Sequence, residues 1–217
     1  MITPKAFLFD LNGTMIDDMN YHIVAWHNLL NNLGAGLSMD RVQEECYGKN
    51  GELLERVFPG RFTENEKNEL GLNKEKTFQA EYRPRLQLIN GLHEFLEDWH
   101  NRGIKMAIGS AAIMFNIDFV LDGLNIRNYF DALISADDVS FSKPHPETYL
   151  KAAIALNVDP ANCLVFEDNP KGVESAKNAG MNVIVITSMH QPHEFEGYDN
   201  IVAFGKDYNH IQLPFNI

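Results

Sequence analysis

The sequence has few of the features that mark secreted or membrane-spanning proteins. Its 217 residues include only two cysteines, Cys46 and Cys163, which lie far apart and in apolar surroundings. This usage is typical of a reducing compartment and excludes a disulfide framework. No apolar run approaches the ~20 residues that a membrane span needs, and residues 1–5 lack the form of a signal peptide. We therefore expect a cytoplasmic protein with no membrane partner and with both thiols buried.

Positive charge is also scarce in this chain. It has 18 Lys and Arg residues against 30 Asp and Glu residues, which gives a formal net charge of −12 at pH 7. Such a balance disfavours general attraction to nucleic acid or to an anionic lipid surface. It does not exclude a phosphorylated substrate, because local cations and a metal ion can concentrate positive charge where it is needed. With 45% hydrophobic and 22% charged residues, the composition is that of an ordinary globular protein.

A continuous apolar run close to the start of the chain leads directly into an acidic, glycine-containing turn. Residues 6–9 are all apolar, and they are followed by Asp10, Leu11, Asn12, Gly13 and Thr14. The run predicts a strand buried on both faces of a parallel sheet. Ligands of open α/β sheets bind outside the carboxyl ends of the strands, where Asp10 would lie. An aspartate there can bind Mg²⁺ or attack an electrophile, although this stretch alone would equally suit a capping role.

Three further polar segments follow later in the chain, and two of them come at the end of an apolar run. They are Ile108-Gly109-Ser110-Ala111, Ser142-Lys143-Pro144 and Val165-Phe166-Glu167-Asp168-Asn169. Together with Asp10 they supply a carboxylate, a hydroxyl, a cation and an acidic pair. The set resembles, in order, the four motifs of the haloacid dehalogenase (HAD) superfamily of phosphotransferases, and the resemblance extends from Asp10 to Gly180. Four motifs in the right order are a specific signal, whereas one of them would be weak.

The chain changes character after the first strand and changes back near Leu88. Residues 17–84 show helical spacing, a Thr63-x-x-Glu66 capping box and no convincing strand. Beyond them, predicted strands at 105–109, 132–136, 164–166, 183–186 and 201–204 alternate with predicted helices, which favours a parallel sheet covered on both faces. We therefore expect an α/β fold with a HAD-like Rossmannoid core of residues 1–16 and 85–217. Residues 17–84 would form an inserted α-helical cap domain similar to that of the β-phosphoglucomutase-like subgroup.

The resemblance implies a role for each catalytic residue. Asp10 would attack phosphorus and form an aspartyl-phosphate, which divides one difficult step into two. The hydroxyl of Ser110 and the main-chain N–H of Ala111 would bind the transferred phosphoryl group. Lys143 would hold a phosphoryl oxygen and keep Asp10 ionised. A lone lysine in this position would ordinarily be a solvated surface residue, and the neighbouring motif favours the catalytic interpretation.

The resemblance also implies Mg²⁺ as the cofactor. Its direct ligands would be Asp10, the main-chain carbonyl of Asn12 and Asp168, because Mg²⁺ prefers oxygen ligands. Glu167 would act on the metal through a water molecule or through a neighbouring ligand. The Glu167–Asn169 segment is also a good helix N-cap, and the two roles are compatible.

Asn12 departs from the family pattern. The family's phosphatases and phosphomutases usually have a second aspartate here, which protonates the leaving oxygen and then activates the acceptor water or hydroxyl. An amide has no accessible proton equilibrium and can do neither. Loss of such a group costs about 10²–10⁴-fold in rate. The sequence leaves open whether Asn12 is natural or was introduced in place of aspartate.

Besides Ala111, four residues are expected to contact the substrate. They are Thr14, His22, Lys49 and Asn50. His22 follows Asp10 by twelve residues, a spacing similar to that of an active-site histidine in the subgroup, although it could instead cap its helix. Residues 47–51 resemble the subgroup's specificity loop, in which β-phosphoglucomutases carry an arginine at the position of Gly51. Its absence disfavours mutase activity, and Lys49 would supply a weaker substitute contact.

These observations predict a monomeric enzyme of phosphate chemistry. The expected activity is Mg²⁺-dependent phosphoryl transfer from, or hydrolysis of, a small phosphorylated metabolite, reduced by the presence of Asn12. One alternative is a β-phosphoglucomutase, which moves phosphate between sugar positions. The other is a catalytically weak protein that binds a phosphorylated metabolite.

Overall fold

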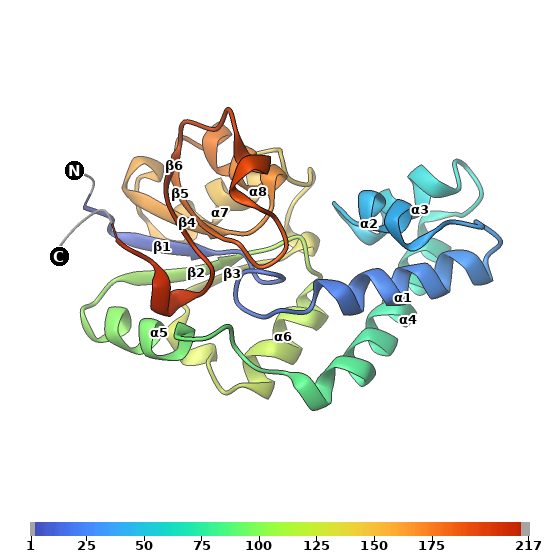
Figure 1. The fold of residues 1–217 in the computed structure, drawn as a ribbon, viewed down its shortest axis with the longest axis horizontal. Coiled ribbons are helices and arrows are strands. Elements are labelled where there is room, and N and C mark those ends of the chain that lie inside the picture. Colours follow the sequence, from blue (N-terminus) through green and yellow to red (C-terminus); the bar gives the residue numbers. More distant parts are fainter. Residues whose placement is uncertain (1–2, 214–217) are drawn as a thin grey trace. The chain divides into compact units, whose positions relative to one another are not determined.

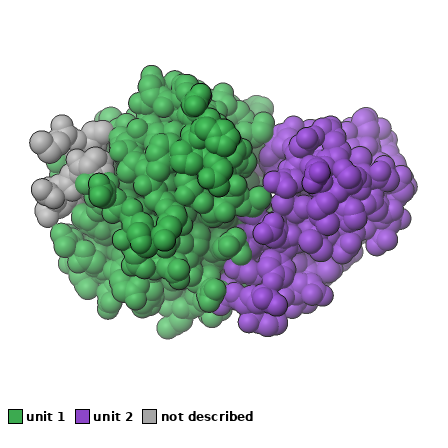
Figure 2. Space-filling model, viewed as in Figure 1, with its two compact units in different colours: residues 1–17, 87–217 green, residues 18–86 purple. Residues whose placement is uncertain are grey.

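The computed structural model describes residues 3–213, which form two compact units (Figures 1 and 2). The first, here called the α/β unit, comprises residues up to Asp17 and residues from Gln87 onward. The second, the helical unit, comprises Asp18–Leu86. The outermost residues of the predicted core domain, 1–2 and 214–217, lie outside the described residues.

The α/β unit contains a six-stranded sheet in which every pairing is parallel. Its strands are β1 (Ala6–Phe9), β2 (Lys105–Gly109), β3 (Ala132–Ile134), β4 (Cys163–Glu167), β5 (Asn182–Ile186) and β6 (Ile201–Gly205). The spatial order is β3-β2-β1-β4-β5-β6, so the chain builds outward from β1 in one direction and then from β4 in the other. The order therefore reverses between β1 and β4, and open α/β sheets bind ligands at such a switch point. The prediction of a parallel α/β sheet is confirmed.

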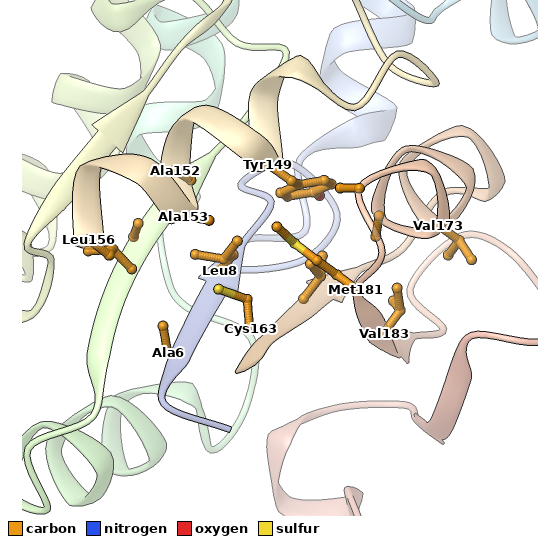
Figure 3. Close-up of a cluster of buried hydrophobic side chains, with 14 of the residues drawn as sticks. Ala6, Leu8, Tyr149, Ala152, Ala153, Leu156, Cys163, Val173, Met181 and Val183 are labelled. Carbon is orange, nitrogen blue, oxygen red and sulfur yellow. The ribbon is translucent and has the colours of Figure 1, made fainter. Parts of the chain in front are cut away.

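Helices cover both faces of this sheet (Figure 1). They are α5 (Leu92–Asn101), α6 (Met114–Gly123), α7 (Glu147–Leu156) and α8 (Pro170–Asn178), and short 3₁₀ turns lie at Arg127–Tyr129, Ala136–Asp138, Pro160–Asn162, Pro192–Phe195 and Tyr208–His210. On the face of α7 and α8, Leu8 of β1 packs among Tyr149, Ala152 and Ala153 (Figure 3). Because both faces are covered, the strands carry nearly continuous apolar side chains, as expected of parallel sheets.

The opposite face of the sheet is packed with aromatic rings. Phe7 and Phe9 of β1 and Phe166 of β4 contact Phe95 of α5, with ring centroids 5.3–6.4 Å apart. Tyr208, from the turn that follows β6, joins this aromatic cluster at 5.3 Å from Phe95 and 5.8 Å from Phe166. Large rings bury much apolar area each, so this cluster anchors β1 and β4 next to one another, immediately before their polar ends.

The helical unit contains four helices and no strand among its residues. They are α1 (Met19–Asn32), α2 (Met39–Glu45), α3 (Asn50–Val57) and α4 (Glu64–Tyr82), followed by a 3₁₀ turn at Arg83–Arg85. The predicted capping box is present, since the Thr63 hydroxyl accepts from the Glu66 N–H and the Glu66 carboxylate accepts from the Thr63 N–H. Of the helices in residues 3–213, none has both the length and the apolar character needed to cross a membrane.

Three local expectations were wrong. The loop expected at 47–51 ends earlier, at Lys49. The Glu52 carboxylate accepts the Lys49 N–H at 2.9 Å, and α3 begins at Asn50 despite the poor helix propensity of Gly51. The strand predicted at 132–136 ends at residue 134, because the Ser135 hydroxyl accepts from Asp137 and starts a 3₁₀ turn. Cys163 is buried as expected, but Cys46 is only half-buried.

Candidate functional site

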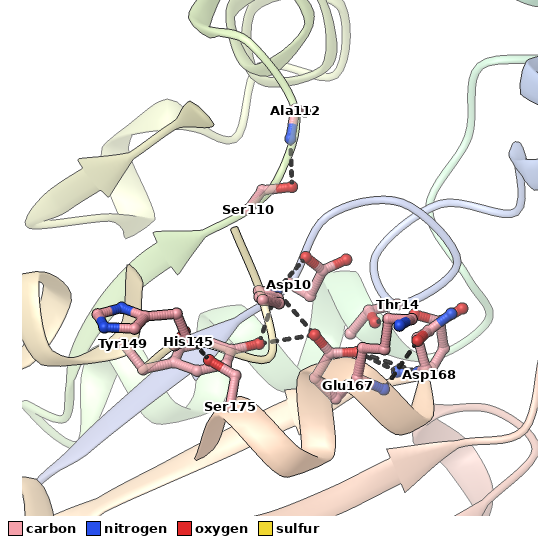
Figure 4. Close-up of polar contacts among 12 residues, drawn as sticks. Asp10, Thr14, Ser110, Ala112, His145, Tyr149, Glu167, Asp168 and Ser175 are labelled. Carbon is pink, nitrogen blue, oxygen red and sulfur yellow. Dashed lines mark hydrogen bonds and ion pairs between the residues drawn. The ribbon is translucent and has the colours of Figure 1, made fainter. Parts of the chain in front are cut away.

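The parallel topology brings the acidic residues of two predicted motifs together at the switch point. Asp10 directly follows β1, and Glu167 and Asp168 lie at the end of β4, the strand paired with β1. The main-chain N–H of Asp10 donates to the Phe166 carbonyl at 3.0 Å, which continues the ladder to the acidic residues. Ser110 follows β2 on the other side of β1 and is buried. The carboxyl ends of three adjacent strands therefore carry Ser110, Asp10 and the Glu167–Asp168 pair (Figure 4).

Lys143, from the segment between β3 and α7, forms ion pairs with both Asp10 and Glu167. Its Nζ lies 2.7 Å from Asp10 Oδ1 and 2.7 Å from Glu167 Oε1. It also donates to the Tyr149 hydroxyl at 2.9 Å, and that hydroxyl donates to Glu167 Oε1 at 2.8 Å. Such charge-assisted bonds are about twice as strong as neutral ones. The lysine predicted to stand beside Asp10 does so, and it is not a solvated surface side chain.

The carboxylates of Asp10, Glu167 and Asp168 form a buried cluster whose oxygens lie within 4.8 Å of one another. Burial is the main cause that raises the pKa of Asp10 to about 7; the Glu167 charge adds to it and the Lys143 charge opposes it. Burial, together with the neighbouring charges of Glu167 and Asp10, holds the pKa of Asp168 well above its usual range. Burial works to lower the pKa of Lys143, but Asp10 and Glu167 outweigh it and the pKa is raised.

The chemistry of this cluster fits a divalent cation. When all three carboxyls are ionised, three carboxylates against one ammonium leave an excess of two negative charges in a buried volume, and a divalent cation would balance that excess. Only oxygens are offered, which suits a hard cation such as Mg²⁺ better than zinc or copper. The cluster could therefore hold a metal, and no other group of three His, Cys, Asp or Glu residues in the described part of the chain could.

Glu167 is bonded at both oxygens, unlike an open metal ligand. Its Oε1 accepts hydrogen bonds from the Lys143 Nζ and the Tyr149 hydroxyl. Its Oε2 accepts hydrogen bonds from the main-chain N–H groups of Asp168 at 2.9 Å and Asn169 at 3.0 Å. Gly172, in the first turn of α8, leaves room for this carboxylate, because a Cβ there would overlap it. Capping of α8 is done by the Asn169 side chain, which accepts from the Lys171 N–H.

The turn after Asp10 is shaped around Asp168. Gly13 has a φ of +76°, a left-handed conformation that favours glycine, and a Cβ there would overlap the Asp168 carboxylate. The Thr14 hydroxyl donates to Asp168 Oδ1 at 3.2 Å. Asn12 forms an isolated parallel bridge with Ile16 at the same turn. The turn thus brings the Thr14 hydroxyl into a hydrogen bond with Asp168, a contact separate from the substrate role predicted for Thr14.

Two positions predicted to bind substrate, the buried His22 and the half-buried Asn50, belong to a polar network within the helical unit. His22 Nε2 is 3.2 Å from Asp18 Oδ2, its Nδ1 is 2.6 Å from Lys74 Nζ, and its ring stacks on Phe78. The same lysine lies 3.1 Å from the Glu75 carboxylate, to which Asn50 donates at 2.8 Å.

Lys49 and Ala111, two further positions predicted to bind substrate, are half-buried. Lys49 is the N-cap residue of α3, directly before Asn50. Ala111 is half-buried beside Ser110, whose hydroxyl accepts the Ala112 N–H at 3.2 Å (Figure 4).

Three residues of the site were missed by the sequence analysis. Tyr149 carried a weak signal, since it lies on the apolar face of a predicted helix just after the Lys143 motif. Ser188 lies two residues after the end of a predicted strand and donates to the Gly13 carbonyl at 2.6 Å. Tyr208 donates to the Thr14 carbonyl at 3.2 Å from a segment with no motif at all.

A parallel α/β sheet with buried carboxylates at its switch point, interrupted after the first strand by a helical segment, defines an α/β protein of the HAD type. Residues 7–186 match the haloacid dehalogenase-like hydrolase family, and the chain belongs to that family. The predicted family and fold class are confirmed.

Curated proteins and solved structures agree with this assignment. The chain is 30% identical over 186 residues to a fructose-1-phosphate phosphatase of Escherichia coli, covering 82% of this chain and 94% of that protein. It is 32% identical over 186 residues to a β-phosphoglucomutase of Bacillus subtilis, and the match covers 82% of this chain and 80% of that protein. A HAD hydrolase of family IA from Entamoeba histolytica has a similar structure, with a TM-score of 0.84, 26% identity and 94% of each chain covered.

Proposed function

We propose that this protein is a Mg²⁺-dependent phosphatase of small phosphorylated sugars that acts through an aspartyl-phosphate on Asp10. The observation that carries the proposal is the buried cluster in which Lys143 lies 2.7 Å from both Asp10 and Glu167, beside Asp168. The family membership and the similarity to a fructose-1-phosphate phosphatase support this substrate class.

In this mechanism an Asp10 carboxylate oxygen attacks the phosphorus in line, and the bond from phosphorus to the sugar oxygen breaks. Lys143 holds Asp10 through Oδ1 and supplies a positive charge for a phosphoryl oxygen. The Ser110 hydroxyl and the Ala111 N–H donate to the other phosphoryl oxygens. A water molecule then attacks the same phosphorus, releases phosphate and restores Asp10.

The metal site of the proposal consists of Asp10, the Asn12 carbonyl and Asp168. A bound Mg²⁺ would neutralise part of the phosphoryl charge. Glu167, bonded at both oxygens, orients Lys143 and the start of the Asp168 segment. Thr14 orients Asp168 through its 3.2 Å hydrogen bond. Calorimetry with Mg²⁺ tests this set: Asp168→Ala should abolish binding in a protein with an unchanged circular dichroism spectrum, and undiminished affinity would contradict the assignment.

Asn12 sets the expected rate, because a side-chain amide can neither protonate the leaving sugar oxygen nor activate water. An aryl phosphate needs little protonation of its leaving group, so the chain should give a burst of phenol followed by slow turnover. Asn12→Asp should raise the steady rate by about 10²–10⁴-fold, and Asp10→Asn should abolish the burst. If Asn12→Asp changes no rate on any phosphorylated sugar tested, the chain is better described as a phosphometabolite-binding protein.

A β-phosphoglucomutase is the second candidate, and the 32% identity to the Bacillus subtilis enzyme favours it. Conversion of glucose 1-phosphate to glucose 6-phosphate, compared with release of inorganic phosphate, separates the two activities. We assign residues 17–84 to a cap domain and His22, Lys49 and Asn50 to substrate recognition. Alanine at any of these three positions should raise KM for the preferred sugar phosphate. We also expect a cytoplasmic monomer, and size-exclusion chromatography with light scattering tests the oligomeric state.

A further inference from the structure

Two hydroxyl groups from the far end of the chain hold the turn that carries Asn12, Gly13 and Thr14. Ser188, from the loop after β5, donates to the Gly13 carbonyl at 2.6 Å. Tyr208, from the turn after β6, donates to the Thr14 carbonyl at 3.2 Å. These two successive carbonyls belong to the turn between Asp10 and the first helix of the chain, and their donors lie more than 170 residues away.

The turn needs such support because Gly13 adopts a left-handed conformation. Glycine loses more conformational freedom on folding than any other residue, so the peptide planes beside it are easily reoriented. In a planar trans peptide the carbonyl and the following N–H turn together. Fixing the Gly13 carbonyl therefore fixes the Thr14 N–H, and fixing the Thr14 carbonyl fixes the next peptide plane as well.

Each donor is itself held firmly by its surroundings. Tyr208 is buried in the aromatic cluster of β1, β4 and α5, and its N–H donates to the Asn90 carbonyl at 2.9 Å. Ser188 follows Thr187, whose N–H donates to the Gly205 carbonyl of β6 at 2.9 Å. On the other side of the turn, the Ile89 N–H donates to the Met15 carbonyl at 2.9 Å. The turn is thus tied to three later segments of the α/β unit.

We propose that Ser188 and Tyr208 are positioning residues of the active site, which hold the Asn12–Thr14 turn so that the Asn12 carbonyl and the Thr14 hydroxyl are aligned for the metal and Asp168. This inference rests on the proposed function for its catalytic consequence, whereas its structural part does not depend on that function. Neither side chain contacts substrate in this account, and both act through the main chain of the turn.

Amide hydrogen exchange tests the structural part without any assay of activity. In the turn, the Gly13 N–H donates to the Ile16 carbonyl and the Met15 N–H to the Leu11 carbonyl, both at 2.8 Å. Ser188→Ala and Tyr208→Phe should each speed exchange of these two amides by about 10-fold, as expected for the loss of one ordinary hydrogen bond. Ser188→Thr keeps the hydroxyl and should restore slow exchange. Unchanged exchange in both deletion variants would overturn the proposal.

Calorimetry and kinetics test the functional part. Ser188→Ala should weaken Mg²⁺ binding and lower kcat by about 10- to 100-fold with little change in KM, because misalignment at the reacting centre affects the transition state most. The matched controls are Thr187→Val in the same loop and Tyr198→Phe, which lack a bond to the turn and should keep wild-type values.

The possible outcomes separate the two proposals. A wild-type protein with no Mg²⁺-dependent phosphatase activity contradicts the proposed function, and exchange and Mg²⁺ affinity then decide whether the two donors hold the turn. An active wild type whose Ser188→Ala variant exchanges faster but keeps its kcat and Mg²⁺ affinity overturns the positioning role. Wild-type kinetics in Ser188→Thr, together with the loss in Ser188→Ala, supports it.

Discussion

Replacing Lys143 by methionine removes the positive charge of the acidic cluster with little change in side-chain length. In the native protein its Nζ bonds Asp10 and Glu167 at 2.7 Å each and the Tyr149 hydroxyl at 2.9 Å. The side chain is 9% exposed, and the Asp10 and Glu167 side chains are 10% and 2% exposed. Methionine would therefore leave buried carboxylates without their cation.

The expected cost follows from this burial. Removing one partner of a buried ion pair typically destabilises a protein by about 3–5 kcal/mol, because an uncompensated charge remains. Protonation can relieve part of that cost, since burial already raises the pKa of Asp10 to about 7 and loss of Lys143 would raise it further. A folded-state pKa above the unfolded value favours folding at low pH, and that contribution is lost as pH rises through the folded pKa. The destabilisation should therefore be largest above pH 7 and smallest near pH 5.

Urea unfolding with and without Mg²⁺ provides the assay. Without metal at pH 8, we expect Lys143→Met to lower the free energy of unfolding by about 3 kcal/mol or more. Saturating Mg²⁺ should recover part of the loss if the cluster binds it. Lys177→Met is the control, because its ion pair with Asp199 is exposed and should contribute less than about 1 kcal/mol. A loss equal to that of the control, or one that grows towards acid pH, would refute the reasoning.

Two further predictions concern α7 and α8. The Lys151 side chain and the Phe141 N–H lower the pKa of Glu147 from 4.5 to about 2, so its stabilising contribution is present above pH 4.5 and is lost as pH falls towards 2. Glu147→Gln should therefore lower the melting temperature at pH 6, and the difference from the wild type should vanish near pH 2. A difference that stays constant with pH would contradict this. Gly172→Ala would force a Cβ into the Glu167 carboxylate and should cost about 1–3 kcal/mol in urea unfolding. Gly51 lies in the first turn of α3, where an added Cβ would meet no atom closer than 3.9 Å, so Gly51→Ala should be neutral or stabilising by up to about 1 kcal/mol. Equal effects at both glycines would contradict the steric argument.

Local patterns in the sequence were sufficient to predict most of the strands and helices and to select the residues of the acidic cluster. The strands predicted at 6–9 and 105–109 coincide with β1 and β2; the exposed Lys105 begins β2, and the buried positions are apolar because both faces of the sheet are covered. The parallel topology then followed from the alternation of strands and helices. Asp10 and Asp168 could be selected because each follows an apolar run and matches a family motif, whereas Lys143 could be selected by its motif alone. Their roles remain predictions, whereas the proximity of the three residues is seen directly in the structure.

Tertiary structure alone decided what surrounds those residues. The strand order places β4 beside β1, and this neighbourhood brings Glu167 within reach of Lys143 and raises the pKa of Asp10 through burial. Ser188 and Tyr208 meet residues 13 and 14 across more than 170 positions of sequence. No local pattern encodes such contacts, because a hydroxyl bonded to a main-chain carbonyl demands no particular residue type at the carbonyl. Only the packing of the complete sheet determines which carbonyl each hydroxyl meets.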